Sequence, residues 1–298
     1  MTKITPKDFS IISTQRHQLA EGPFWCGRTQ TLYWVDIPAC EIWCWNSSNE
    51  QPHCWRMPKK VSAVFTTDTD QLLVVLKDEV ALFDPDTKTL QTLCELDTDR
   101  ANNRSNDAGI APDGSLWVGT MDDEEKQSSG RLWRIDTDGT KRCLLDNVGI
   151  ANTFAWDRQR GVFYFADSMA ASIYRFPYPE FTDTRPTHAA FVQLTDGSVP
   201  DGSAIDSAGN LWNAQWDGGK VVQYSPNGDV LSTLSLPMQR PTSCCFGGKD
   251  GQTLFITTAS IGLSAKQIAA QPNAGQVIAV AVSESGQPGQ LFSVPINR

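Results

Sequence analysis

Residues 115–120 read SLWVGT, a short apolar run that recurs five more times along the 298-residue chain. The other copies are TLYWVD at 31–36, QLLVVL at 71–76, VFYFAD at 162–167, NLWNAQ at 210–215 and TLFITT at 253–258. Successive copies lie 40 to 48 residues apart when each is counted from its anchor residue, namely Leu32, Leu72, Leu116, Phe163, Leu211 and Leu254. A period of this length, filled with short strands, is typical of propeller blades.

A second strand pattern follows each copy of the first. It reads EIWCWN at 41–46, EVALFD at 79–84, GRLWRID at 130–136, SIYRFP at 172–177, KVVQYS at 220–225 and QVIAVAV at 276–282. Six such repeats use the whole chain, so the sequence predicts an all-β, six-bladed β-propeller that forms one domain over residues 1–298. We expect residues 9–17 to supply the outer strand that closes the last blade, because closure leaves no exposed sheet edge.

Composition and charge narrow the classes of partner. A net charge of −9 without a local basic cluster disfavours nucleic acid and anionic membranes as partners. The N-terminus has no apolar run behind Lys3 and Lys7, so we expect a cytoplasmic protein. We also expect a monomer or weak homo-oligomer. Eight cysteines without CxxC spacing favour reduced thiols, and neighbouring Cys244 and Cys245 should point to opposite faces of one strand.

Counting back from the anchors compares one position across all blades. Ten or eleven residues before each anchor, at the start of the expected innermost strand, stand Glu21, Ser62, Asn106, Asn152, Asp201 and Ser243. The innermost strands of a propeller run side by side around its central channel. These residues are therefore expected to meet at one mouth of that channel.

Three of these positions carry oxygen donors suited to a metal ion. Glu21, Asn152 and Asp201 offer carboxylate and amide oxygens, which suit Ca²⁺, Mg²⁺ or Mn²⁺, with Zn²⁺ also compatible. Three protein ligands leave room for water and substrate, as a catalytic ion requires. Spacing alone gives equal weight to the alternative that polar groups simply line a wet channel.

Other catalytic classes have little support in the sequence. The only three histidines are His17, His53 and His188, and none falls at an inner-strand position. No GxSxG motif occurs, which disfavours an α/β-hydrolase type of serine hydrolase.

Five segments resemble one protein family. They are LAEGPFW (19–25), NNRSNDAGIAPDGSLWVGTMDDE (102–124), GIANTFAWD (149–157), VPDGSAID (199–206) and TSCCFGGKDGQTLFITTA (242–259). In this order they resemble the gluconolactonase and regucalcin (senescence marker protein) family, and most closely its bacterial sugar-lactonase branch. The resemblance spans nearly the entire chain.

This resemblance implies a propeller that hydrolyses sugar lactones with one divalent ion. The family's metal ligands fall on Glu21, Asn152 and Asp201, and its substrate-contacting arginine and asparagine fall on Arg104 and Asn106. A further acidic substrate contact falls on Glu124. Three positions depart from the commoner family pattern: Ala108 and Thr153 replace glycines, and the segment 122–129 is short.

The reaction expected from these residues is hydrolysis of an aldonolactone, such as a glucono-, galactono-, xylono- or arabinono-lactone. Asp201 is the expected general base, and Arg104, Asn106 and Glu124 are the expected substrate contacts. Two alternatives stay open at this point, a calcium-binding regulatory protein without significant turnover and an interaction propeller with a purely structural channel.

Overall fold

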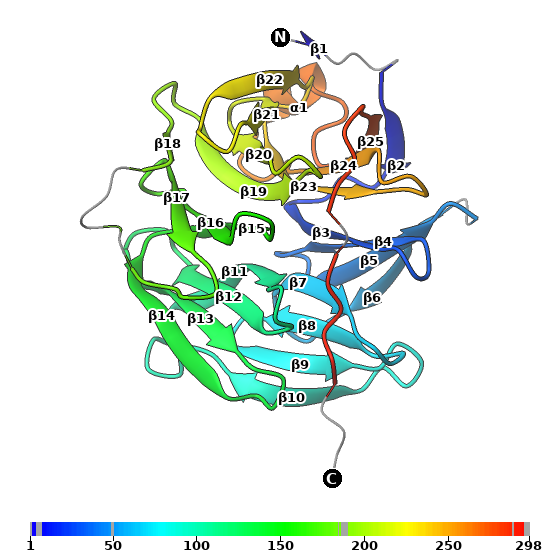
Figure 1. The fold of residues 1–298 in the computed structure, drawn as a ribbon. Coiled ribbons are helices and arrows are strands. Elements are labelled where there is room, and N and C mark those ends of the chain that lie inside the picture. Colours follow the sequence, from blue (N-terminus) through cyan, green and yellow to red (C-terminus); the bar gives the residue numbers. More distant parts are fainter. Residues whose placement is uncertain are drawn as a thin grey trace.

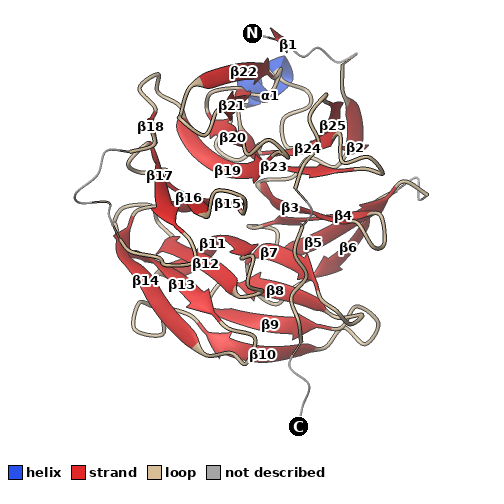
Figure 2. Ribbon diagram, viewed as in Figure 1, coloured by secondary structure: helices blue, strands red, loops and turns tan. Residues whose placement is uncertain are grey.

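The computed structural model describes residues 2–3, 8–48, 51–183, 185, 190–287 and 289–294. Its strands form six sheets arranged around a common centre (Figure 1). Helix α1 (Ala265–Ala270) lies outside the blades, in the connection between residues 258 and 277. Figure 2 shows how completely strands dominate the fold. Within the described ranges, no helix has the length and apolar character needed to cross a membrane.

The first three blades each contain four antiparallel strands. Blade 1 contains β3 (Ala20–Cys26), β4 (Thr31–Asp36), β5 (Glu41–Asn46) and β6 (His53–Arg56). Blade 2 contains β7 (Val61–Thr66), β8 (Leu72–Leu76), β9 (Glu79–Phe83) and β10 (Leu90–Glu95). Blade 3 contains β11 (Asn103–Ile110), β12 (Leu116–Asp122), β13 (Gly130–Ile135) and β14 (Lys141–Val148).

The other three blades follow the same plan with additions at their outer edges. Blade 4 contains β15 (Ala151–Asp157), β16 (Val162–Asp167), β17 (Ser172–Pro177) and β18 (Val192–Gln193). Blade 5 contains β19 (Val199–Ile205), β20 (Leu211–Trp216), β21 (Lys220–Tyr224) and β22 (Val230–Ser235), and β1 (Thr2–Lys3) pairs parallel with β22. Blade 6 contains β23 (Pro241–Gly247), β24 (Thr253–Thr258), β25 (Val277–Ala281) and β2 (Ser10–Ser13).

The predicted closure of the last blade is confirmed. Strand β2 comes from the N-terminal region 9–17 and pairs antiparallel with β25. The first and last parts of the chain thus share one sheet. Two hairpin turns also follow the sequence chemistry, because Gly139 and Gly228 adopt φ values of 84° and 92°.

The repeated apolar run forms the second strand of every blade, and it supplies much of the core. Trp34 of β4, Trp117 of β12 and Trp212 of β20 are the largest fully buried side chains among the described residues. Cys244 and Cys245 follow the predicted alternation, because Cys244 packs in the cluster that contains Trp212 and Cys245 packs against that of Trp34. Both are free thiols.

The C-terminal segment, residues 283–287 and 289–294, crosses one face of the propeller and is here called the strap (Figure 1). Its first half bonds to blades 5 and 6, where the Ser207 amide donates to the Ser285 carbonyl oxygen at 2.7 Å. Its second half bonds to blade 2, where the Phe292 amide donates to the Thr66 carbonyl oxygen at 3.3 Å. The strap therefore joins blades on opposite sides of the channel.

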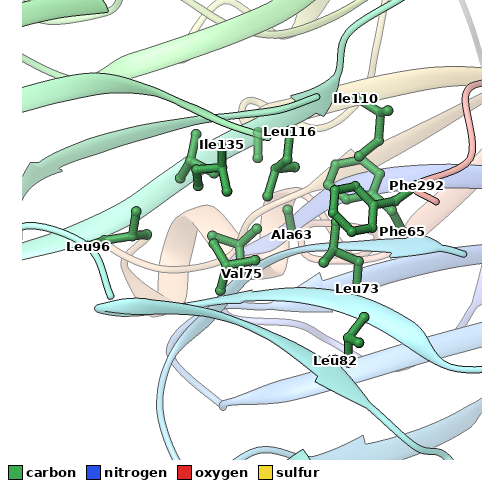
Figure 3. Packing of buried hydrophobic residues seen from close by; sticks show 13 residues of the cluster. Ala63, Phe65, Leu73, Val75, Leu82, Leu96, Ile110, Leu116, Ile135 and Phe292 are labelled. Carbon is green, nitrogen blue, oxygen red and sulfur yellow. The ribbon is translucent and has the colours of Figure 1, made fainter. Parts of the chain in front are cut away.

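Phe292 anchors the strap in the core. Its side chain is fully buried in the cluster between blades 2 and 3, near Phe65 and Ile110 (Figure 3). We expect Phe292→Ala to lower the free energy of unfolding by about 3–5 kcal/mol, because a buried aromatic side chain is lost and a cavity remains. Urea denaturation measures this loss. The matched control is Leu291→Ala at the neighbouring position, which is 39% exposed and should cost under about 0.5 kcal/mol. Equal losses in the two variants would contradict the anchoring role.

Candidate functional site

A β-bulge interrupts the innermost strand of every blade near the position that the repeat count selects. The register shifts lie between Glu21 and Phe24, Val61 and Ala63, Ser105 and Asp107, Asn152 and Ala155, Pro200 and Ser203, and Pro241 and Ser243. Bulges break the strict alternation of a strand and re-aim side chains, and they are common beside active sites. The predicted ring of six equivalent residues is therefore in place, although Asn106 is the fourth residue of β11 and does not open the strand.

Glu21 and Asp201 come into direct contact. Their side chains hydrogen-bond to each other, and each residue is about 6% exposed. Burial raises the pKa of both carboxyl groups, and the charge of Asp107 raises each pKa further. Two buried carboxyl groups in contact repel each other when both are ionised, so the pair retains a proton unless a cation compensates the charge.

Asn152 joins this pair from the neighbouring blade. Its Nδ2 atom donates to Ser168 Oγ at 2.8 Å, and Ser168 Oγ donates to the carbonyl oxygen of Pro200, next to Asp201. Its Oδ1 atom accepts a hydrogen bond from Asn106 Nδ2 at 3.1 Å. The three predicted ligands therefore belong to one buried, hydrogen-bonded region.

Arg104 lies beside this region and is itself almost buried, at 6% exposure. Its Nη1 atom donates to Asn106 Oδ1 at 2.7 Å, and its Nε atom pairs with the Asp123 carboxylate at 3.0 Å. Asp123 also pairs with Lys60. The Arg104 guanidinium thus reaches Asn152 through Asn106, which places the two predicted substrate contacts next to the predicted ligands. The Asn106 amide is fully engaged by protein groups, so a substrate would have to exchange one of these bonds.

Glu124 is not brought to the cluster. Its side chain is 66% exposed and pairs with Lys126 at 2.8 Å, within the turn after β12. The carboxylate that meets Arg104 is that of Asp123, one residue earlier. A role for Glu124 in substrate binding stays a prediction, and it requires the turn to move toward the site.

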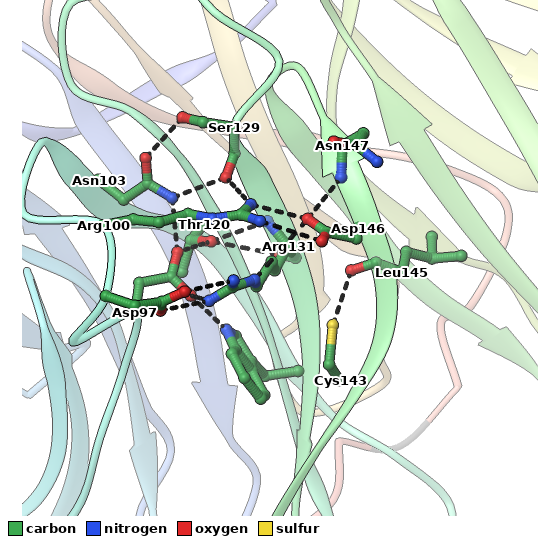
Figure 4. Close-up of polar contacts among 12 residues, drawn as sticks. Asp97, Arg100, Asn103, Thr120, Ser129, Arg131, Cys143, Leu145, Asp146 and Asn147 are labelled. Carbon is green, nitrogen blue, oxygen red and sulfur yellow. Dashed lines mark hydrogen bonds and ion pairs between the residues drawn. The ribbon is translucent and has the colours of Figure 1, made fainter.

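A polar network fixes the strands that carry Arg104 and this turn (Figure 4). Buried Asp97 accepts hydrogen bonds from Asn103 Nδ2 and Thr120 Oγ1, both at 2.6 Å, and pairs with Arg131. The Ser129 carbonyl oxygen accepts from Asn103 Nδ2 at 2.8 Å. Because Asn103 directly precedes Arg104, this network holds the start of β11 against β12 and the end of the 122–129 turn.

The two positions at which this chain replaces the family's glycines differ in backbone conformation. Ala108 has a negative φ and donates its amide to Asp107 Oδ1 at 2.8 Å, so this position needs no glycine. Thr153 is fully buried with φ at 59°, a conformation that a β-branched residue rarely adopts. Its Oγ1 atom donates to the carbonyl oxygen of Asp201 and contacts Ser203 Oγ at 2.9 Å. These bonds help to offset the strain and link the Asn152 bulge to that of Asp201.

Asp107 is a site residue that the inner-strand spacing does not predict. This carboxyl group lines the central cavity, and burial raises its pKa to about 7. Its position depends on the bulge between Ser105 and Asp107, which lets neighbouring Asn106 and Asp107 both face the channel. No feature of the sequence marks this bulge. Ser168 is not predicted either, since it follows a second strand and lies outside the inner-strand count.

The chemistry of the donor set fits a divalent cation. Two contacting carboxyl groups and the nearby Asn152 amide offer hard oxygen donors. Burial and the charge of Asp107 raise the pKa of Glu21 to about 8, although the charge of Arg104 lowers it, so a cation would be needed for both groups to ionise. Among the described residues, no three His, Cys, Asp or Glu side chains could hold an ion by themselves. A site here therefore depends on the Asn152 amide.

We expect the metal-free protein to lose stability as the pH rises from about 5 to about 8. Asp107 has a pKa of about 7 in the fold, above its unfolded value, and the Glu21 and Asp201 pKa values are also raised. Raised values mean that the fold binds these protons more tightly, so their contribution is full at low pH and is lost as the groups ionise. Thermal melts across this range measure the effect.

The matched control for this experiment is the same pH series with a saturating divalent ion. A bound cation favours the ionised carboxylates, so the fall in melting temperature should shrink. Asp107→Asn should reduce the slope of the metal-free protein. A metal-free melting temperature that rises over the range would contradict the assignment.

Several known proteins are similar to this chain over most of its length. The SMP-30/Gluconolactonase/LRE-like region matches residues 19–260. The 6-deoxy-6-sulfogluconolactonase of Pseudomonas putida is 32% identical, over 92% of this chain and 95% of that protein. The L-arabinolactonase of Azospirillum brasilense is also 32% identical, over 95% of both chains.

A solved structure shows the same fold. The calcium-binding protein regucalcin of Agrobacterium tumefaciens superposes with a TM-score of 0.89 at 26% identity, over 98% of this chain and 99% of that one. One conclusion follows from the propeller fold, the match to residues 19–260 and the relatives above 30% identity. The chain belongs to the SMP-30/gluconolactonase/LRE-like family.

Proposed function

We propose that this protein hydrolyses the ring ester of a sugar lactone, an aldonolactone, with one divalent ion held by Glu21, Asn152 and Asp201. The observation that carries the proposal is the buried contact between Glu21 and Asp201, with Asn152 bonded into the same region and Arg104 beside it. The relatives support it, since two are named as lactonases of sugar derivatives.

A divalent cation bound at these residues would supply Lewis acidity that polarises the lactone carbonyl. Asp201 would accept a proton from the attacking water, a role supported by its position in the buried pair and its raised pKa. The water oxygen forms a bond to the carbonyl carbon, the ring C–O bond breaks, and the accepted proton passes to the departing ring oxygen. The product is the open sugar acid.

Arg104 and Asn106 would orient the substrate. The Arg104 guanidinium is fixed by Asp123 and Asn106, so it can donate hydrogen bonds to sugar oxygens with little loss of side-chain entropy. Burial of the whole cluster excludes bulk water and strengthens each of these interactions.

A panel of aldonolactones tests the proposal. Glucono-, galactono-, xylono- and arabinono-lactones are added to the purified protein with Ca²⁺, Mg²⁺, Mn²⁺ or Zn²⁺, and proton release is followed against the spontaneous rate. At least one lactone should turn over well above that rate. Metal binding without turnover of any lactone would instead favour a calcium-binding regulatory protein, a possibility raised by the structural likeness to regucalcin.

A further inference from the structure

The central channel contains a cavity of about 700 Å³. Most of its lining comes from the later residues of the inner strands, such as Phe24 to Cys26 of β3 and Phe154 to Trp156 of β15, while its inner end reaches Gly22, Asp107 and Ser243. Glu21, Asn152 and Asp201 stand near the starts of their strands. The cavity therefore extends from beside these ligands toward the other face, where its lining includes Gly286, Gln290 and Leu291 of the strap.

Six aromatic side chains of described residues line this cavity, namely Phe24, Trp25, Phe65, Phe154, Trp156 and Phe246. Phe24 and Phe65 pack edge to face with ring centroids 5.4 Å apart, and Trp25 stacks on Phe255 at 5.3 Å. Cavities of about 300–1,000 Å³ with aromatic walls and a few polar groups are typical of small-molecule sites.

The rim of the cavity is cationic. Arg28, Arg158 and Lys249 all line it, and no carboxylate of a described residue lies within ion-pair distance of them. Single unpaired cations occur elsewhere, as at Arg142, but here three share one cavity. Asp250 is the one acidic residue described at this rim, so positive charge prevails there although the chain as a whole carries −9.

Two of these cations are held in place by uncharged groups. Arg28 Nη2 donates to the carbonyl oxygens of Thr67 and Thr69 at 3.1 and 3.2 Å. The Arg158 guanidinium lies against the side-chain amide of Gln290 in the strap, whose oxygen can accept from it once the amide is turned toward it. Partial burial lowers the pKa of Arg158. These contacts fix the guanidinium groups without neutralising them, which leaves their charge to a ligand.

We propose that this cavity binds a small organic anion with one carboxylate and an apolar, aromatic-sized body. The carboxylate pairs with Arg158 and Lys249 at the rim, and the body packs on the aromatic walls. Asp107 at the inner end disfavours a second anionic group there. The proposed contacts at the rim use none of the predicted metal ligands, so carboxylate binding should not require the lactone chemistry.

Isothermal titration with 3-phenylpropanoate tests the proposal, with uncharged 3-phenylpropanamide as the matched ligand. Wild-type protein should bind the carboxylate more tightly than the amide. The double variant Arg158→Gln/Lys249→Gln should weaken carboxylate binding about tenfold or more, because charge-assisted hydrogen bonds are lost, and leave amide binding unchanged. Both residues are exposed, so the variant should fold normally.

Two controls keep the result specific to this cavity. Lys266→Gln removes an exposed lysine from α1, which follows the end of β24 on the opposite face, and should leave both affinities unchanged. Titration in excess chelator should also leave carboxylate binding intact. The proposal would be overturned by equal affinity for acid and amide or by no effect of the double variant. It would also be overturned by loss of binding with chelator or by no binding at millimolar ligand.

Discussion

Asp201→Asn, assayed at saturating metal, is expected to lower kcat for lactone hydrolysis by about 10²- to 10⁴-fold, the usual cost of losing one general base. The substitution keeps the size of the side chain and one oxygen that can bind a cation. It removes the negative charge and the basicity, and an amide cannot accept the proton of the attacking water. The backbone anchors should persist, because the Asp201 carbonyl oxygen accepts from Thr153 Oγ1 and Asn213 Nδ2.

A metal titration separates the two roles assigned to Asp201. If the residue is a ligand alone, activity should return as the metal concentration rises and refills the site. If it is also the base, kcat should stay low at saturation, with metal content confirmed by elemental analysis. A metal-saturated variant with near wild-type kcat would remove the base assignment and leave the ligand assignment intact.

Removal of the divalent ion is expected to abolish measurable lactonase activity. Several kcal/mol of transition-state stabilisation are lost with the ion, which corresponds to a fall in rate of about 10³-fold. Glu21→Gln should produce a similar loss at low metal concentration, because it removes one carboxylate from the buried pair with Asp201. Activity after exhaustive chelation and after readdition of each ion measures the effect.

Arg104→Ala is the matched comparison for the ligand variant. Arg104 touches Asn106 and Asp123 but no predicted ligand directly. The variant should therefore keep its metal content near that of the wild type while losing activity. Full lactonase rates in verified metal-free protein would exclude the Lewis-acid role, and metal loss in Arg104→Ala would move this residue into the ligand set.

Much of this arrangement is predictable because a propeller repeats itself. The anchors from Leu32 to Leu254 locate every blade, since an apolar run recurring at one period must fill equivalent strands. The same period places Glu21 and Asp201 on one ring, although they are 180 residues apart, and the structure brings them into contact.

The parts that escaped prediction depend on local geometry without a repeating signal. The direction of Glu124 is set by a turn in which Asp122 accepts from the Lys126 amide at 3.0 Å. The proximity of Asp107 to the channel depends on a bulge that the two-residue period of a strand does not reveal. The strap is held by scattered backbone bonds and by Phe292, so its sequence has no strand pattern to detect.

The bulge near the start of each inner strand also bears on how relatives of this protein diverge. Because every blade already presents one residue outside the regular alternation, a single codon change there exchanges a donor group while the blade scaffold persists. Ser62 and Ser243 occupy two of these positions, and neither is among the predicted ligands. After gene duplication, such positions offer short mutational routes to a different ion or a different sugar.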